Sequence, residues 1–374
     1  MRFGEFTENW IKKRFYEIAD FYKGCGISKE QLTLEGNECI LYGELYTTYD
    51  TETIEEIKSK TNMESKGLFF SKKNDVIIPA SGETPIDIAT ACCVCKDNVL
   101  LGGDLNVIRL KYNNGSFISC QLNGKRKIDI AKIAQGASIV HLHNDDLMKL
   151  VLYIPTTLEE QLKIVKLFTL IDNRIKTQSK IIKNFESLIC SLRNIIFSNN
   201  KWKWIRLDKL VESKIIELKR GNIIPKHTKD SEYCYPVYSS SVHNNGLMGY
   251  HNTFMFDKEL ITWSVDGGGD FFYRNKHKFN VTNVCGIMET TNKYDYLFLY
   301  EILKHQHQKL LFDYQTKAHP SVIIKLYYLP KVEISNQKSI AKIFKMYYEK
   351  LQKEKDILEL YKKQKAYLLQ NMFI

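Results

Sequence analysis

The chain has 374 residues, a formal net charge of +11 at pH 7 and a sequence pI near 9.0. Its length allows two domains of ordinary size, and its 22 tyrosines and 19 phenylalanines exclude a disordered chain. The positive charge favours a polyanionic partner, and no apolar run reaches the ~20 residues of a bilayer span. The absence of a signal-peptide pattern and the nine irregularly spaced cysteines lead us to expect a reducing cytoplasm.

The first predicted domain covers residues 1–155 and mixes helices with short strands. Trp10 opens an amphipathic segment that continues through Phe15 and Ile18 and stops at Gly24. Alternating stretches between polar turns predict strands, and one periodic stretch predicts a helix. The predicted strands are Cys39–Gly43, Asp75–Pro79 and Leu105–Leu110, and the predicted helix is Lys127–Ile133.

A long helix is predicted next, within residues 156–200. From Leu158 to Phe197 the apolar residues recur at steps of three and four, with Gln178 as the polar interruption. About 40 residues rising ~1.5 Å each make a rod of roughly 60 Å. Because its apolar stripe is narrow, such a rod needs a partner helix.

The second predicted domain covers residues 201–330. Trp204 opens it, as Trp10 opens the first, but the interiors of the two domains do not align. Similar frames with dissimilar interiors are typical of one scaffold that carries two different recognition surfaces. The predicted strands are Tyr235–Tyr238, Glu259–Trp263 and Val281–Cys285, and the predicted helix is Tyr296–Leu311.

A second long helix, within residues 331–374, repeats the first. Tyr-Ile-Pro precedes the first helix and Tyr-Leu-Pro precedes the second. Gln161 and Gln337 then occupy matching positions, and the helices end at Ile196-Phe197 and Met372-Phe373. A repeat of this kind determines how the whole chain is divided: domain, helix, domain, helix.

These residues resemble the specificity (S) subunits of type I restriction–modification systems over essentially the whole chain. The resemblance rests on the Pro155-Thr-Thr-Leu-Glu-Glu-Gln161 element and on the ending Leu368-Leu-Gln-Asn-Met-Phe373. The second copy departs from the pattern, because Ser335-Asn-Gln337 replaces Glu-Glu-Gln and one extra residue follows Pro330. This difference puts in doubt contacts that the acidic residues make.

The resemblance implies an α+β (mixed α/β) fold, with two target-recognition domains separated by two long helices in a pseudo-twofold repeat. We expect the helices to pair antiparallel as a coiled coil that spaces the domains for one DNA duplex. The residues expected at the subunit or helix-pair interface are Leu162, Val165, Phe168, Ile175, Ile182, Ile189, Leu192, Ile340, Phe344, Tyr347, Leu351, Leu358 and Leu368.

Double-stranded DNA is the expected ligand, with Lys and Arg on phosphates and polar side chains at base edges. Candidates were chosen for amide, hydroxyl or guanidinium groups in turn-like, glycine-flanked settings. The same residues commonly do no more than satisfy turns, and this reading stays open. The candidates are Lys23, Tyr46, Thr47, Thr48, Arg109, Arg220, Tyr238, Ser239, Ser240, His243, Asn244, Asn245 and Arg274.

Enzymatic and metal-binding signatures are weak. Cys92-Cys-Val-Cys95 lacks a second cysteine pair, so buried free thiols in a strand are the better interpretation. His141, His143, His305 and His307 are interpreted as surface or edge residues. Asp266–Asp270 is glycine-rich but lacks phosphate-loop residues, which favours a flexible loop near DNA. The seven prolines include no adjacent pair, so the Asn/Asp-Pro-Pro-Tyr/Phe element of adenine methyltransferases is absent.

The chain is therefore expected to be a non-catalytic subunit without cofactor. The family implies a bipartite, asymmetric DNA target, two adenine methyltransferase (M) subunits that use S-adenosylmethionine, and restriction (R) subunits, where present, that use ATP and Mg²⁺. Two alternatives stay open: the recognition subunit of a restriction system outside type I, and a coiled-coil scaffold that does not bind DNA.

Overall fold

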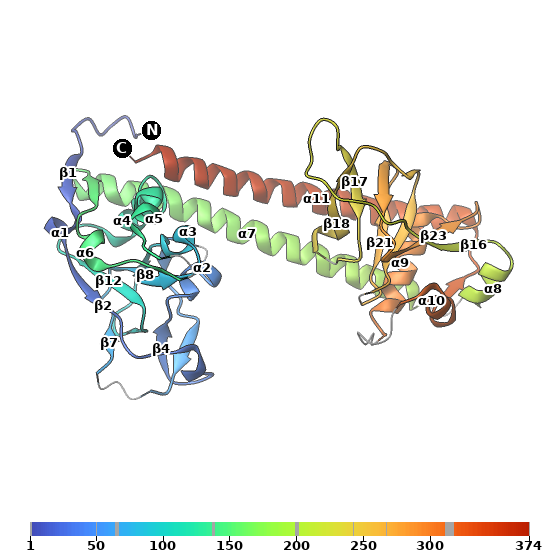
Figure 1. Cartoon of the computed structure of the whole chain (residues 1–374), viewed down its shortest axis with the longest axis horizontal. Coiled ribbons are helices and arrows are strands. Elements are labelled where there is room, and N and C mark those ends of the chain that lie inside the picture. The colour runs from blue at the N-terminus through green and yellow to red at the C-terminus, as the bar shows by residue number, and fades with distance from the viewer. Residues whose placement is uncertain are drawn as a thin grey trace. The chain divides into compact units, whose positions relative to one another are not determined.

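The computed structural model describes residues 2–49, 51–63, 67–136, 139–198, 202–241, 243–266, 268–310 and 318–373. The chain divides into two compact units. Unit 1 comprises Met1–Ser179 with Asp356–Ile374, and unit 2 comprises Lys180–Lys355. The two long helices, α7 (Leu158–Phe197) and α11 (Ile334–Asn371), each contribute one segment to each unit (Figure 1).

Unit 1 contains two five-stranded sheets. The first has the order β2-β12-β8-β10-β5 and the second β3-β6-β4-β11-β7. Helix α4 packs on β8 and β10 of the first sheet. The strands are β2 (Ala19–Lys23), β3 (Leu32–Thr33), β4 (Asn37–Ile40), β5 (Thr53–Ile54), β6 (Ser59–Thr61), β7 (Phe69–Phe70), β8 (Asp75–Pro79), β10 (Cys92–Val94), β11 (Leu100–Leu101) and β12 (Leu105–Leu110).

Shorter elements complete unit 1. Strand β1 (Ile11–Arg14) pairs with β14 (Val151–Ile154), and β9 (Ser81–Gly82) pairs with β13 (Val140–His141). The helices are α1 (Phe15–Ile18), η1 (Lys29–Gln31), α2 (Glu44–Thr47), α3 (Pro85–Ile88), α4 (Gly115–Asn123), α5 (Lys127–Ile133) and α6 (Asn144–Leu147).

Unit 2 contains two four-stranded sheets, ordered β16-β23-β20-β21 and β18-β17-β22-β19, and a separate pair, β15 with β24. The strands are β15 (Trp204–Arg206), β16 (Ile216–Arg220), β17 (Tyr235–Tyr238), β18 (Leu247–His251), β19 (Phe256–Asp257), β20 (Leu260–Ser264), β21 (Phe271–Arg274), β22 (Lys278–Val281), β23 (Cys285–Thr290) and β24 (Tyr328–Pro330). The helices are α8 (Leu207–Glu212), η2 (His243–Gly246), α9 (Tyr296–His307) and α10 (Pro320–Leu326).

The two units share one frame around the start of each long helix. In unit 1 the side-chain oxygen of Gln161 accepts a hydrogen bond from the backbone N–H of Asn114, the N-cap of α4 (2.9 Å). In unit 2 the side-chain oxygen of Gln337 accepts one from the backbone N–H of Asp295, the N-cap of α9 (3.0 Å). Both glutamine side chains are buried, and each accepts from a backbone N–H at the N-terminus of a domain helix. The repeated Gln therefore fixes a domain helix to a long helix.

In each unit an aromatic side chain from the C-terminal end of one long helix completes the hydrophobic core. Phe373, which follows α11, packs on Phe117 of α4 (5.6 Å between centroids) and Phe168 of α7 (6.2 Å) in unit 1. Phe197, at the end of α7, packs on Phe298 of α9 (5.8 Å) and Phe344 of α11 (6.2 Å) in unit 2. Each domain is thus completed by the start of one long helix and the end of the other.

The helix segments run antiparallel within each unit. In unit 1 Phe168 meets Phe373 and Arg174 meets Tyr361; in unit 2 Phe197 meets Phe344 and Arg193 meets Tyr348. The predicted fold class, mixed α+β domains with two long antiparallel helices in a pseudo-twofold repeat, is confirmed. The predicted interface residues Phe168, Ile182, Ile189, Phe344, Leu351 and Leu368 are buried, and Val165, Ile175, Leu192, Ile340, Tyr347 and Leu358 are half-buried.

Leu162 is 48% exposed and so lies outside the buried contact between the helices, and its place at a subunit interface stays a prediction. The buried stripe of α7 passes through its neighbour Gln161, whose amide is required at the N-cap of α4. A stripe chosen by hydrophobicity alone therefore selects the leucine one position away.

Buried charges connect the helices, and they differ between the units. In unit 1 the ammonium of Lys365 on α11 lies 2.7 Å from carboxylate oxygens of Asp172 on α7 and of Glu52. Burial alone would lower the pKa of Lys365, but the two carboxylates outweigh it and raise that pKa. In unit 2 Arg193 on α7 instead bonds to Glu301 of α9 (2.8 Å).

Several predicted segments correspond to observed elements. Strands β8, β12 and β17 and helix α5 have the predicted bounds. The predicted strand Val281–Cys285 is wrong, because those residues join the end of β22 to the start of β23. The segment from Trp10 forms β1, α1 and β2 in succession. Lys201, Gly267 and Leu311 lie outside the described residues.

Across the parts of the chain that the structure describes, no helix combines the length and apolar character that crossing a membrane requires.

We expect Lys365→Met to lower the free energy of unfolding by about 3–5 kcal/mol, because it leaves two carboxylates buried without their cation. Urea denaturation followed by tryptophan fluorescence measures the loss. The control is Lys362→Met on the same helix, where an exposed lysine pairs with Glu359 and a change of less than about 0.5 kcal/mol is expected. Equal losses in the two variants would contradict a structural role for the buried cluster.

Candidate nucleic-acid interface

Six of the eight predicted DNA-contacting residues of unit 2 lie on one hairpin. Strand β17 ends at Tyr238, the η2 turn follows, and β18 returns antiparallel (Figure 1). The backbone N–H of Ser239 donates to the carbonyl oxygen of Gly246 (2.7 Å), which closes the hairpin. Asn244 and Asn245 have left-handed backbones (φ 49° and 53°), a conformation that Asn tolerates better than most residues.

This geometry leaves polar side chains free at the turn. His243, Asn244 and Asn245 are exposed, and Ser239 and Ser240 are half-exposed. Amide, imidazole and hydroxyl groups are the groups that read base edges in a DNA groove. The turn therefore has the chemistry of a sequence reader.

Arg274, also predicted to contact DNA, lies beneath this turn and is 1% exposed. Its guanidinium carbon lies 3.8 Å from the ring centroid of Tyr238. The Tyr238 hydroxyl in turn lies 3.1 Å from Nε2 of His277. Arg274 thus belongs to the support of the turn.

Arg220 lies at the end of β16 and is exposed. Its Nε donates to the carbonyl oxygen of Asn283 (2.9 Å), and the neighbouring N–H of Thr282 donates to the carbonyl oxygen of Tyr238 (2.9 Å). Arg220 is therefore connected through the 282–283 turn to the end of β17. An exposed cation beside a polar turn suits a phosphate contact.

In unit 1 the predicted candidate Arg109 is held within the domain. Its guanidinium forms two hydrogen bonds to the carboxylate of Asp75 (2.9 and 2.8 Å), and Asp75 is 1% exposed. The hydrogen bond to Asp75 raises the pKa of Arg109, and the guanidinium also lies 5.2 Å from the ring centroid of Tyr22. This pairing explains Arg109 as a structural cation.

The remaining unit 1 candidates are exposed or half-buried. Lys23 ends the edge strand β2 and is exposed. Thr47 and Thr48 end α2, where the Thr47 hydroxyl donates to the carbonyl oxygen of Gly43 (2.8 Å). Burial raises the pKa of Tyr46, and nearby Asp87 and Glu83 raise it further. Those acids make the Tyr46 surroundings unfavourable for a phosphate.

A group of cations lies over aromatic rings at the β18-β17-β22-β19 sheet and was not among the predicted site residues. The ammonium of Lys278 lies 4.7 Å from the ring centroid of Phe254, and that of Lys229 lies 5.5 Å from that of Tyr250. Lysines and exposed rings together can hold phosphates and stack on bases. No local pattern could identify them, because the sheet brings their segments together from distant positions.

The cysteine prediction is confirmed in its position: Cys92 and Cys93 are buried in β10. For the histidines, His141 and His143 are exposed, but His305 is buried, which corrects its interpretation as a surface residue. Its Nδ1 lies 3.1 Å from the side-chain oxygen of Asn194. Burial lowers the pKa of His305.

No group of three potential metal-ligating side chains is found among the residues that the structure describes.

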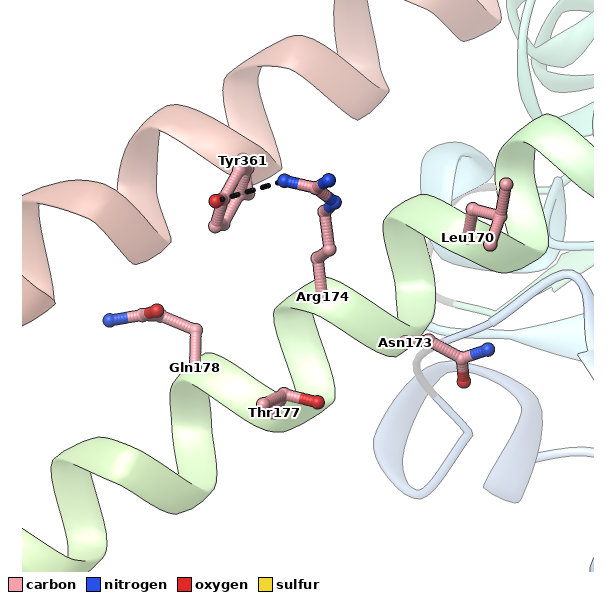
Figure 2. Close-up of a pocket in the computed structure, with 6 residues that line it drawn as sticks. All are labelled: Leu170, Asn173, Arg174, Thr177, Gln178 and Tyr361. Atoms are coloured by element: carbon pink, nitrogen blue, oxygen red, sulfur yellow. Dashed lines mark hydrogen bonds between the residues drawn. The ribbon is translucent and has the colours of Figure 1, made fainter.

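Figure 2 shows a hollow on the helix pair of unit 1. Arg174 of α7 donates to the hydroxyl of Tyr361 of α11 across it (3.5 Å). Beside it Leu170 is 53% exposed. The lining residues are Leu170, Asn173, Arg174, Thr177, Gln178 and Tyr361, so none of the predicted DNA-contacting residues lines it.

Comparison with known proteins places part of the chain beside a known family. Residues 199–361 match the family model described as "Type I restriction modification DNA specificity domain". This part of the chain is similar to the specificity domains of type I restriction–modification systems. The type I restriction enzyme MpnII specificity subunit of Mycoplasma pneumoniae is 40% identical over 81 residues, covering 21% of this chain and 24% of the relative. The chain spans less than half the length of the first curated relatives that it matches.

Two solved structures share the fold of this chain along nearly its whole length. One is the type I restriction–modification system S subunit from M. genitalium (TM-score 0.60, 19% identity, 98% of this chain and 96% of that chain). The other is a chain from a study of "complex assembly and conformational transition of the type I R-M system" (TM-score 0.63, 13% identity, 97% of each chain).

We expect Arg109→Gln to lower the free energy of unfolding by about 3 kcal/mol, because Asp75 would be left buried without its cation. Urea denaturation measures this loss. Lys23→Gln, at an exposed position, is the matched control and should leave stability unchanged. A loss of DNA affinity by Arg109→Gln without a loss of stability would instead make Arg109 a DNA-contacting residue.

Proposed function

We propose that the chain is the sequence-specific DNA-binding subunit of a type I restriction–modification complex and recognises a bipartite, asymmetric target. The observation that carries this proposal is the repeated frame with unlike interiors. Gln161 and Gln337 hold equivalent helices, whereas unit 1 carries five-stranded sheets and unit 2 carries four-stranded sheets. Two unlike readers in one chain would read two unlike half-sites, which gives an asymmetric target.

The η2 turn is the proposed base reader of unit 2. Exposed His243, Asn244 and Asn245 would contact base edges, and Arg220 would contact phosphate. In unit 1, Lys23, Thr47 and Thr48 stay candidates. The net charge of +11 supports attraction to a polyanion.

Exposed apolar side chains on the long helices support a protein partner. Leu158 and Leu170 of α7 are 51% and 53% exposed in unit 1, and Met346 of α11 is 45% exposed in unit 2. Burying such exposed apolar side chains against a partner would favour association. We infer that two adenine methyltransferase subunits bind the two similar helix frames, since repeated surfaces bind repeated partners.

Chemistry would belong to those partners. The methyltransferase subunits would use S-adenosylmethionine, and restriction subunits, where present, would use ATP and Mg²⁺. The chain itself would be non-catalytic and would act in the cytoplasm, where chromosomal DNA and both cofactors are available.

Long-read mapping of methylated adenines in cells with and without this gene tests the function. We expect one split, asymmetric motif to be methylated only when the gene is present, together with no methylation by the purified chain alone. An unchanged methylation pattern would favour a coiled-coil scaffold that does not bind DNA. A gene neighbourhood without an adenine methyltransferase would favour a restriction system outside type I.

Leu170→Glu tests the docking surface. A carboxylate at this exposed position should weaken methyltransferase binding at least tenfold, because an apolar contact would have to bury a charge. Co-purification and isothermal titration with the methyltransferase subunit measure the change. Lys180→Glu, an exposed polar position on the same helix, is the control, and equal binding by both variants would contradict docking at Leu170.

A further inference from the structure

A buried cation supports the η2 turn without a carboxylate partner. Arg274 is 1% exposed and forms no ion pair with any carboxylate in the described part of the chain. Burial lowers the pKa of Arg274 to about 10. Because an unpaired buried charge is costly, its retention calls for a role beyond the packing of β21.

The guanidinium connects the β-sheet to the turn. Its Nε donates to the hydroxyl oxygen of Thr262 on β20 (3.0 Å), and Thr262 is fully buried. Its Nη1 donates to the carbonyl oxygen of Asn245 (2.7 Å). The Tyr238 ring stacks on the same group. One planar group therefore fixes the main chain of Asn245 against a rigid strand, a geometry that a fork of donors suits.

The third nitrogen, Nη2, is buried and has no acceptor among the described residues. It faces the underside of the turn. A Cβ placed on Gly246 would stand 3.1 Å from Nη2, 2.8 Å from the carbonyl oxygen of Ser239 and 3.4 Å from that of Ser241. The position of this Cβ is thus within 3.4 Å of an unused donor and of two carbonyl oxygens, and glycine leaves that position unfilled.

We propose that Arg274 is a positioning residue that sets the base-reading geometry of the η2 turn from below. It holds the carbonyl of Asn245 in the free protein, and its Nη2 bonds to a carbonyl of Ser239 or Ser241 when the turn settles on DNA. The inference rests on the proposed function and assigns Arg274 a role other than direct base contact, because a side chain with 1% exposure does not reach a groove.

This role predicts which DNA affinities fall when Arg274 is replaced. Removing the guanidinium should misplace the His243–Asn245 side chains, which lowers affinity for the correct sequence and leaves affinity for other sequences unchanged. A phosphate contact behaves differently, since its loss weakens binding to all sequences and reduces the salt dependence of binding.

The experiment uses the full chain in complex with its methyltransferase subunit and two duplexes. One duplex carries the motif found by methylation mapping, and the other carries a scrambled unit 2 half-site. Arg274→Gln should lower the ratio of the two affinities 10- to 100-fold, with the slope of log affinity against log salt unchanged. Arg220→Gln is the control: it should weaken both duplexes equally and reduce the slope by about 0.9 for one lost phosphate contact.

Thermal melting shows whether Arg274→Gln folds. If it does not, two further variants test the same role. Arg274→Lys keeps the charge on a single donor nitrogen but not the planar fork, so it should lose part of the discrimination. Gly246→Ala places a methyl between Nη2 and Ser239 at φ +80°, so it should lose discrimination with the charge intact.

The outcomes are distinguishable. A wild-type ratio in folded Arg274→Gln, or in both Arg274→Lys and Gly246→Ala, would overturn the positioning role. A reduced salt slope in Arg274→Gln would overturn it in favour of direct phosphate contact. If the wild-type complex itself does not distinguish the two duplexes, the proposed function fails.

Discussion

The core of each domain depends on an aromatic side chain from the end of a long helix. Phe373 fills unit 1 between Phe117 and Phe168, and Phe197 fills unit 2 between Phe298 and Phe344. Burying a Phe side chain is worth about 1.5–3 kcal/mol, and leaving its cavity costs more. The core of each domain is therefore incomplete without both long helices. Folding of the two domains is thus linked to pairing of α7 with α11.

Polar contacts give that pairing its direction. The buried amides of Gln161 and Gln337 accept backbone donors at the start of α4 and α9, so each long helix begins against its own domain. Buried charges then distinguish the ends: Lys365 requires the carboxylates of unit 1, and Arg193 requires Glu301 of unit 2. Because an unmatched buried charge is costly, these clusters oppose exchange of one helix end for the other.

The fixed main chain of the η2 turn allows its exposed side chains to vary without loss of the fold. The η2 turn has exposed amide and imidazole side chains over a main chain held by Arg274, so adaptable groups sit on a fixed support. Under the proposed function, other specificities would arise by changing the exposed side chains while the buried guanidinium, Thr262 and Gly246 stay. Arg109, in contrast, neutralises buried Asp75 and stabilises the sheet of unit 1.

The sequence by itself determined the features that local patterns encode. The helix Leu158–Phe197 follows from apolar spacing, strands β8, β12 and β17 follow from short apolar runs between turns, and the paired Gln and Phe positions follow from the repeat. The tertiary structure decided which polar groups lie inside. Gln161 is buried where Leu162 is exposed, His305 is buried, and Arg274 lies below the turn that it was expected to accompany. Each of these outcomes depends on a partner distant in the chain, such as Asn114, Asn194 or Asn245. Local periodicity reports which residues are apolar, whereas the burial of a polar group depends on whether the fold supplies its hydrogen-bond partner.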